Sequence, residues 1–157
     1  MSGAWHVSVA RDMLRPDFVR RKLHLIAEDL ERLARFRHDS LDDLHADEIR
    51  MAAVERLLER IVMRAIDVNE HLISELASGT GTMTRLTYRQ TFTWLADFGV
   101  YDSDFAATFA ASAGLRNILV HDYNDVDRAI VHGAIHSCLR DYPQYIDAVT
   151  SFLDRQP

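Results

Sequence analysis

The sequence DEIRMAAVERLLERIVMRAIDVNEHLISELA, residues 47–77, decides the fold because its apolar residues recur with helical spacing. Its apolar residues form two stripes. Steps of four and three give the first, Val54, Leu58, Ile61, Ala65, Val68 and Leu72, and a second consists of Leu57, Val62, Ile66, Ile73 and Leu76. We therefore expect a long helix that is buried on two sides. A small bundle covers one side, and we expect a second subunit on the other, giving a homodimer. The alternative is a central helix covered entirely within one chain.

The flanking sequence continues this helical pattern. A helix is predicted from Pro16, and residues 39–43 are predicted to form a turn or a cap cluster. Thr87 to Gln90 resembles a capping box that opens a short helix, and Gly99 suits its end.

The second half of the chain predicts two further helices. Residues 103–120 form one that is rich in alanine and glycine, so we expect it at the centre of the bundle. The last helix begins near Val126 and contains Pro143, where we expect a kink or a short break. The fold class is therefore all-α: an antiparallel bundle of about five helices, in one domain over residues 1–157, with residues 1–15 as an N-terminal arm.

Composition excludes several classes of protein. The chain has 157 residues, 18 of them Lys or Arg and 24 Asp or Glu, and its net charge of −6 disfavours a broad basic face for duplex nucleic acid. The single cysteine, Cys138, excludes an internal disulfide and a cysteine-based zinc site. The sequence contains no apolar run long enough to span a membrane and no secretion signal at its start. We therefore expect a cytoplasmic protein.

The stretch LRNILVHDYN, residues 115–124, carries the candidate chemistry. Arg116 lies among apolar residues near the end of the small-residue helix, and His121 and Tyr123 follow where that helix should end. Arginine binds phosphate through a rigid charged fork, and histidine exchanges protons near neutral pH. His121 would take a ribose 2′-hydroxyl proton or orient the attacking group, while Arg116 stabilises charge on the phosphate. The alternative is structural, with Arg116 complementing the helix dipole and His121 in a solvated turn.

This stretch resembles the Arg-x4-His-x-Tyr motif of the HepT-like toxins in the HEPN superfamily, and Asn117 matches the polar residue that usually follows the motif arginine. The long second helix and the Tyr88–Phe92 opening of the next helix extend the resemblance to roughly residues 17 to 154. The resemblance implies a HEPN-type bundle that dimerises and acts as a metal-independent ribonuclease toxin of a type VII-like system. It also implies an MntA-type nucleotidyltransferase antitoxin that transfers AMP to the motif tyrosine. By motif position, Arg116 and His121 are the catalytic pair and Tyr123 is the AMP acceptor.

Other residues complete the predicted site. Asp67 and His71 share one face of the long helix and could orient Arg116 or His121, although an ordinary surface pair has the same spacing. Arg85 and Arg89, which flank Tyr88, could contact RNA or the partner protein, although a solvated helix start is favoured. His132 and His136 have a spacing compatible with metal binding, but two ligands are too few.

The prediction is therefore a nuclease that needs no metal or other cofactor. Single-stranded RNA is the expected substrate, because its bases and 2′-hydroxyls are accessible. The alternative function is a non-catalytic nucleotide-binding or protein-interaction module.

Overall fold

The computed structural model describes residues 15–77, 86–120 and 125–156. Six helices and no strand occur in these ranges: α2 (Pro16–Ala34), α3 (Leu41–His45), α4 (Glu48–Leu76), α5 (Tyr88–Asp97), α6 (Ser103–Val120) and α7 (Asp125–Arg155). The predicted all-α class is confirmed. The predicted N-terminal arm lies, except for its last residue, outside the described residues.

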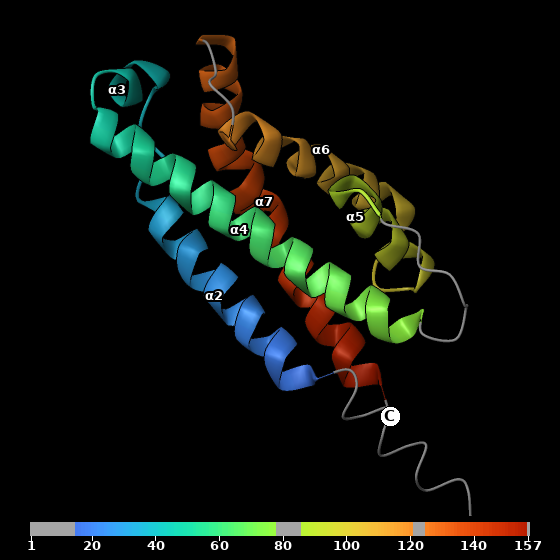
Figure 1. Ribbon diagram of the computed structural model, residues 1–157. Helices are drawn as coiled ribbons and strands as arrows, with labels where there is room; N and C mark the ends of the chain where they lie inside the picture. The colour runs from blue at the N-terminus through green and yellow to red at the C-terminus, as the bar shows by residue number, and fades with distance from the viewer. Residues whose placement is uncertain (1–14, 78–85, 121–124, 157) are drawn as a thin grey trace, which may run out of the picture.

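Helix α4 is the centre of the bundle (Figure 1), and it packs against α2, α3, α5, α6 and α7. Residues of both predicted stripes are buried in the single chain, among them Leu58 and Ile61 of the first stripe and Val62 and Ile66 of the second. The expectation that the second stripe meets another subunit is therefore wrong. The alternative, a helix covered by its own bundle, is what the structure shows.

Local capping sets where the helices begin. The Asp47 carboxylate accepts hydrogen bonds from the first-turn amides of α4, and Thr87 forms the predicted capping box with Gln90 at the start of α5. Gly99 follows α5 with a φ of 83°, a left-handed conformation that favours glycine. Residues 39–43 contain the cap that was one of the two predicted alternatives: Ser40 forms a second capping box, which starts the one-turn helix α3 that was not predicted.

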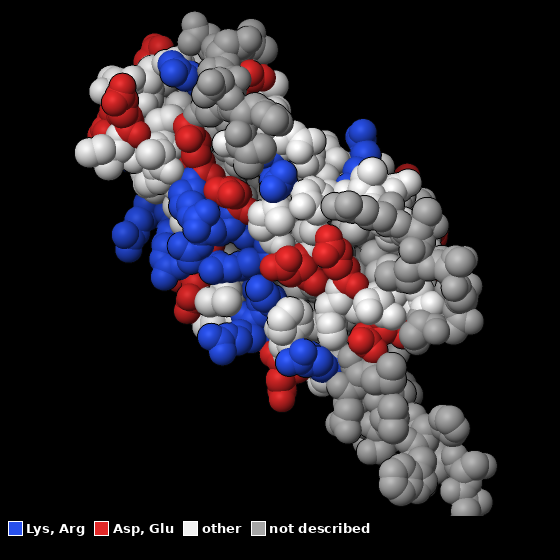
Figure 2. Space-filling view, in the orientation of Figure 1, with Lys and Arg blue, Asp and Glu red and all other residues white. Residues whose placement is uncertain are grey.

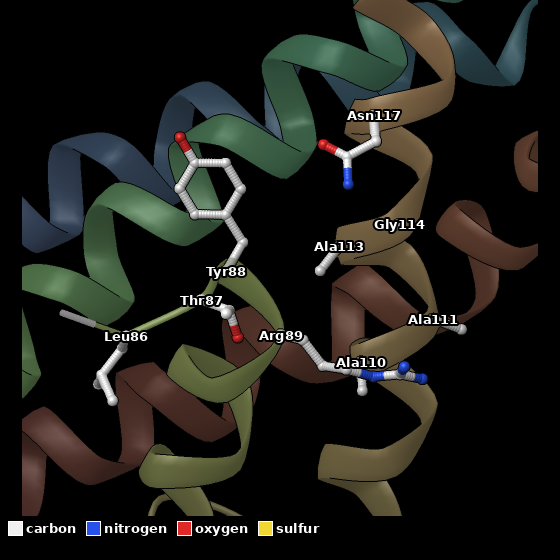
Figure 3. Close-up of a pocket in the computed structure, with 9 residues that line it drawn as sticks. All are labelled: Leu86, Thr87, Tyr88, Arg89, Ala110, Ala111, Ala113, Gly114 and Asn117. Atoms are coloured by element: carbon white, nitrogen blue, oxygen red, sulfur yellow. The ribbon is translucent and has the colours of Figure 1, made fainter. Parts of the chain in front are cut away.

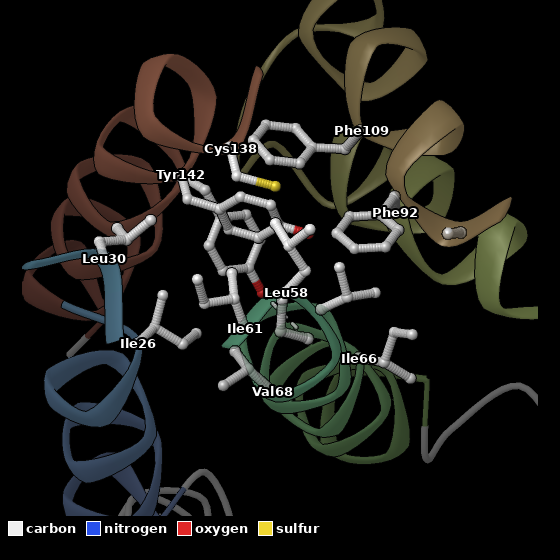
Figure 4. Packing of buried hydrophobic residues seen from close by; sticks show 14 of the residues in the cluster. Ile26, Leu30, Leu58, Ile61, Ile66, Val68, Phe92, Phe109, Cys138 and Tyr142 are labelled. Atoms are coloured by element: carbon white, nitrogen blue, oxygen red, sulfur yellow. Dashed lines mark hydrogen bonds between the residues drawn. The ribbon is translucent and has the colours of Figure 1, made fainter. Parts of the chain in front are cut away.

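An aromatic cluster joins α5, α6 and α7 in the core (Figure 4). Phe92 and Phe109 stack with ring centroids 5.6 Å apart, and Tyr142 meets Phe109 edge-on at 5.0 Å. Beside them, the buried Tyr145 hydroxyl donates hydrogen bonds to the Asn69 side chain and to a backbone carbonyl of α4. These contacts position α6, which carries the predicted motif arginine.

Two expectations about the later helices are corrected. Helix α6 lies to one side of α4 and is not central, because Ala107, Ala111 and Gly114 are exposed although Ala106 and Ala113 are buried. Its small residues border surface cavities as well as helix contacts. Helix α7 continues through Pro143, which excludes the predicted short break but not the alternative, a kink. None of the helices described has both the length and the apolar character needed to cross a membrane.

Candidate functional site

Arg116 lies in the last two turns of α6 and reaches across to the start of α5. Its guanidinium carbon is 5.3 Å from the centre of the Tyr88 ring, within the range of a cation–π contact. The Arg116 Nε atom is buried and has no hydrogen-bond partner within the described part of the chain. No carboxylate of the described ranges forms an ion pair with Arg116. The ring therefore orients the arginine, and no described carboxylate neutralises its positive charge.

A cavity of about 550 Å³ opens beside this contact, between the start of α5 and the face of α6. We call it the α5–α6 cavity, and its lining consists of Leu86, Thr87, Tyr88, Arg89, Ala110, Ala111, Ala113, Gly114 and Asn117. Its volume lies in the range typical of small-molecule sites. Tyr88 belongs both to the lining and to the contact with Arg116, so the cavity adjoins the motif.

The predicted site residues have different positions. Asn117 lines the α5–α6 cavity next to Arg116. Asp67 of α4 forms an ion pair with Lys22 of α2 at 3.2 Å. The described partner of Arg116 is Tyr88 of α5. Among the described residues no hydrogen bond or ion pair joins Asp67 to Arg116, and the supporting role of Asp67 stays a prediction. His121 and Tyr123 lie outside the described residues.

While Arg85 lies outside the described residues, Tyr88 and Arg89 lie at the start of α5, where Arg89 is exposed, as the favoured interpretation of a solvated helix start predicts. The capping box correctly places both residues in the first turn of α5. Their proximity to the motif follows from the packing of α5 against α6, which joins residues far apart in the sequence. One signal was available, since an arginine next to an aromatic residue at a helix start also suits a phosphate site.

The remaining cysteine and histidine candidates, Cys138 and His132, are engaged in packing or hydrogen bonding. Burial raises the pKa of the Cys138 thiol to about 12, so the thiol is protonated at neutral pH and is a poor nucleophile. The His132 Nε2 atom lies 2.8 Å from the backbone carbonyl of Asp39. Throughout the described ranges, no group of three or more His, Cys, Asp or Glu side chains is arranged to hold a metal ion.

Comparisons with known proteins agree with the motif. The family model described as "Ribonuclease HepT-like" matches residues 26–149. The chain is also 36% identical over 140 residues to the tRNA nuclease HepT of Aphanizomenon flos-aquae, which covers 89% of this chain and 92% of that protein. This chain belongs to the HepT-like ribonuclease family. A second HepT relative, the mRNA nuclease of Shewanella oneidensis, is 29% identical over 92 residues, covering 59% of this chain and 66% of that protein.

Solved structures share the fold of this HepT-like chain. A mutant MntA–HpeT toxin–antitoxin complex matches with a TM-score of 0.72 and 26% identity, covering 86% of this chain and 98% of that one. A tri-AMPylated Shewanella oneidensis HEPN toxin in complex with an MNT antitoxin matches with a TM-score of 0.71 and 24% identity over the same shares. The predicted family, HEPN-type fold and nuclease class are confirmed.

Proposed function

We propose that this HepT-like chain is the toxin of a toxin–antitoxin pair and that it cleaves RNA without a metal ion, with Arg116 and His121 as the catalytic pair. One observation carries the proposal: Arg116 of the intact motif is oriented by Tyr88 and has no carboxylate partner in the described chain. A buried salt bridge would neutralise such an arginine. An uncompensated guanidinium beside a cavity is suited to a phosphate.

The reaction needs one base and one charge stabiliser. His121 accepts the proton of a ribose 2′-hydroxyl, and the 2′-oxygen forms a bond to the adjacent phosphorus. The bond from phosphorus to the 5′-oxygen breaks, and the protonated histidine returns a proton to that oxygen. The Arg116 guanidinium stabilises the negative charge that builds on the phosphate oxygens during this exchange. None of these reaction steps requires a metal ion.

Cleavage assays test this proposal. The tests use a tRNA pool and an mRNA, the substrate classes in the relatives' names, and EDTA is present throughout. We expect the unmodified chain to cleave RNA, and we expect Arg116→Ala and His121→Ala to lose cleavage while circular dichroism shows that they fold. Arg21→Ala is the charge-matched control, since Arg21 is exposed on α2. Cleavage that depends on a divalent metal would contradict the proposal. Tight mononucleotide binding without loss of RNA would favour the non-catalytic module.

We propose that an MntA-type nucleotidyltransferase antitoxin silences the chain by transferring AMP to Tyr123. The toxin in one structural relative is tri-AMPylated and bound to an MNT antitoxin, which supports this regulation. Incubation with the antitoxin and ATP should raise the mass of the chain in steps of one AMP. The modification should map to Tyr123 and be absent from Tyr123→Phe. An unchanged mass, or AMP on another residue, would overturn the assignment.

We propose that the working form is a cytoplasmic homodimer in which two copies of the motif share one cleft. Two arginine–histidine pairs facing one cleft would create a local positive potential despite the net charge of −6. The buried stripes of α4 do not supply the dimer surface, so it lies elsewhere on the protein. Light scattering during gel filtration should give twice the chain mass of 18.0 kDa. A monomeric mass at assay concentration would exclude the dimer.

A further inference from the structure

The α5–α6 cavity differs in charge from two other cavities of the described structure. The cavity between α6 and α7 has a lining that includes both Arg140 and Asp141, which form an ion pair at 2.8 Å. The third cavity is lined by two carboxylates, Glu48 and Glu55, together with Arg128. Among its described lining residues, the α5–α6 cavity has Arg89 and no acidic residue. Only this cavity of the three therefore has the charge that attracts an anion.

The polar groups of the cavity come from both of its walls. Figure 3 shows the Arg89 side chain reaching from α5 toward Ala110 and Ala111 of α6, while the Asn117 amide points from α6 toward the start of α5. Arg89 and Asn117 are both exposed. Within the described chain, no carboxylate is paired with Arg89. A guanidinium and an amide that converge on one space provide donors for phosphate oxygens and both donor and acceptor groups for a base.

The α6 wall leaves room for a ligand. Ala110, Ala113 and Gly114 present no more than a methyl group to the cavity. A Cβ atom added at Gly114 would meet nothing within 4 Å. The cavity is thus an open space with polar groups at its edges, as a nucleotide requires.

We propose that the α5–α6 cavity binds the nucleotide next to the scissile phosphate of single-stranded RNA. Arg89 binds the phosphate of that nucleotide, and Asn117 forms hydrogen bonds with its base. The proposal rests on the function given above, since Tyr88 lines the cavity and also contacts Arg116. A strand whose scissile phosphate meets Arg116 therefore continues past Tyr88 into the cavity. Arg89 is a substrate-binding residue in this arrangement and takes no part in the proton transfers.

Steady-state cleavage of a single-stranded oligoribonucleotide tests the proposal. We expect Arg89→Ala to raise KM about tenfold and to change kcat less than twofold, because one phosphate contact is lost and the reacting groups remain. Arg89→Lys should have an intermediate KM, since lysine keeps the charge without the fork. Arg21→Ala removes the same charge from α2 and should leave KM within twofold. Equal effects of the Arg89 and Arg21 variants would overturn the proposal.

A binding assay separates this proposal from the proposed function. In an Arg116→Ala chain that leaves the RNA intact, adding Arg89→Ala should weaken binding about tenfold and reduce the salt slope of log K by about one. If the unmodified chain cleaves RNA and Arg89→Ala does not change KM, the proposal that the cavity binds a nucleotide is wrong, while the proposed ribonuclease function stands. If RNA binding depends on Arg89 but the unmodified chain does not cleave RNA, the proposed ribonuclease function is wrong, while nucleotide binding in the cavity stands.

Gly114→Leu provides a second, uncharged variant. Its side chain should fill the cavity and raise KM by at least about fivefold, while Arg89 remains in place. Thermal unfolding establishes that the variant is folded before KM is measured. A folded Gly114→Leu chain with an unchanged KM would show that no nucleotide occupies the cavity.

Discussion

Two groups of arginines occupy different sides of this bundle, and they differ in what neutralises them. On the α2–α4 side, Arg32, Arg60 and Arg64 converge on the carboxylate of Asp29, which is completely buried. On the α5–α6 side, Arg89 and Arg116 have no carboxylate partner within the described chain. Figure 2 shows the lysines and arginines of one face gathered over α2 and α4, with acidic side chains beside them.

The difference indicates which group is structural. The Arg32 and Arg60 nitrogens lie 2.8 and 3.1 Å from the Asp29 oxygens, and Arg64 also donates to a backbone carbonyl of α2. Arg60 and Arg64 lie on α4 and therefore contribute to holding α2 against α4, whereas Arg32 pairs with Asp29 within α2. Arg116 instead rests on an aromatic ring, which orients a guanidinium without cancelling its charge. We infer that the first group can be tested through stability and the second through cleavage.

The largest expected effect on stability is at Asp29. Asp29→Ala should lower the free energy of unfolding by about 3 kcal/mol, because it leaves arginines without their buried partner. The loss of the partner costs most at Arg64, because only 18% of its side chain is exposed and its charge is therefore the least solvated of the three arginines. Urea denaturation at pH 7 measures the change, and cleavage per folded molecule should stay constant. Asp67→Ala is the control: it removes the more exposed pair with Lys22 and should cost at most about 1 kcal/mol. Equal losses for the two variants would mean that the Asp29 cluster has no special structural role.

At Arg116 we expect the opposite pattern. Arg116→Lys keeps the positive charge but loses the planar fork, so kcat/KM should fall about 100-fold. The midpoint of urea denaturation should hardly move, because no described ion pair is broken. Arg60→Lys is the matched control on the other side of the bundle and should leave kcat/KM within twofold. Full activity of Arg116→Lys would show that a point charge without the planar fork suffices at this position.

The two sides of the bundle also show what could be predicted from the sequence. Helix periodicity and capping predicted α2, α4, α5 and α6 almost residue by residue, because these signals are local. Helix α3 was missed because five residues cannot show a period, and only its capping box and the buried Leu44 mark it. The stripes of α4 showed correctly that two sides are buried. They could not show what covers each side, which is why the predicted subunit contact on α4 was wrong.

The candidate site was predicted only in part, for the same reason. Arg116 and Asn117 belong to a local motif that can be read along one helix. The contact of Arg116 with Tyr88, and the position of Arg89 at the cavity, depend on how α5 packs against α6. That packing is fixed by the aromatic cluster around Phe92 and Phe109, whose partners lie on different helices. The ion pair of Asp67 with Lys22 likewise depends on packing, here of α2 against α4, and could not be inferred from spacing along one helix.

A smaller effect should appear when the ring beneath Arg116 is changed. Tyr88→Leu removes the cation–π contact, worth about 1 kcal/mol, so kcat should fall about fivefold. Tyr88→Phe keeps the ring and should restore kcat, which a loss of general packing would not predict. Steady-state kinetics of both variants, with thermal unfolding as a check on folding, make the measurement. The ring has no positioning role if the two variants have the same kcat.

The smallest expected effect distinguishes a functional surface from a structural one. Gly114→Ala replaces an exposed glycine within α6, so the lower cost of ordering alanine in a helix should stabilise the chain by about 0.5–1 kcal/mol. The added methyl group meets no neighbour within 4 Å, so no clash offsets the gain. Gly99→Ala is the matched control and should have the opposite sign, because Gly99 has a φ of 83°. Urea denaturation of the pair gives both signs. If Gly114→Ala gains stability and also raises KM for RNA, glycine at position 114 keeps space for a ligand at the expense of helix stability. If Gly114→Ala is instead less stable, α6 packs more tightly there than the structure indicates.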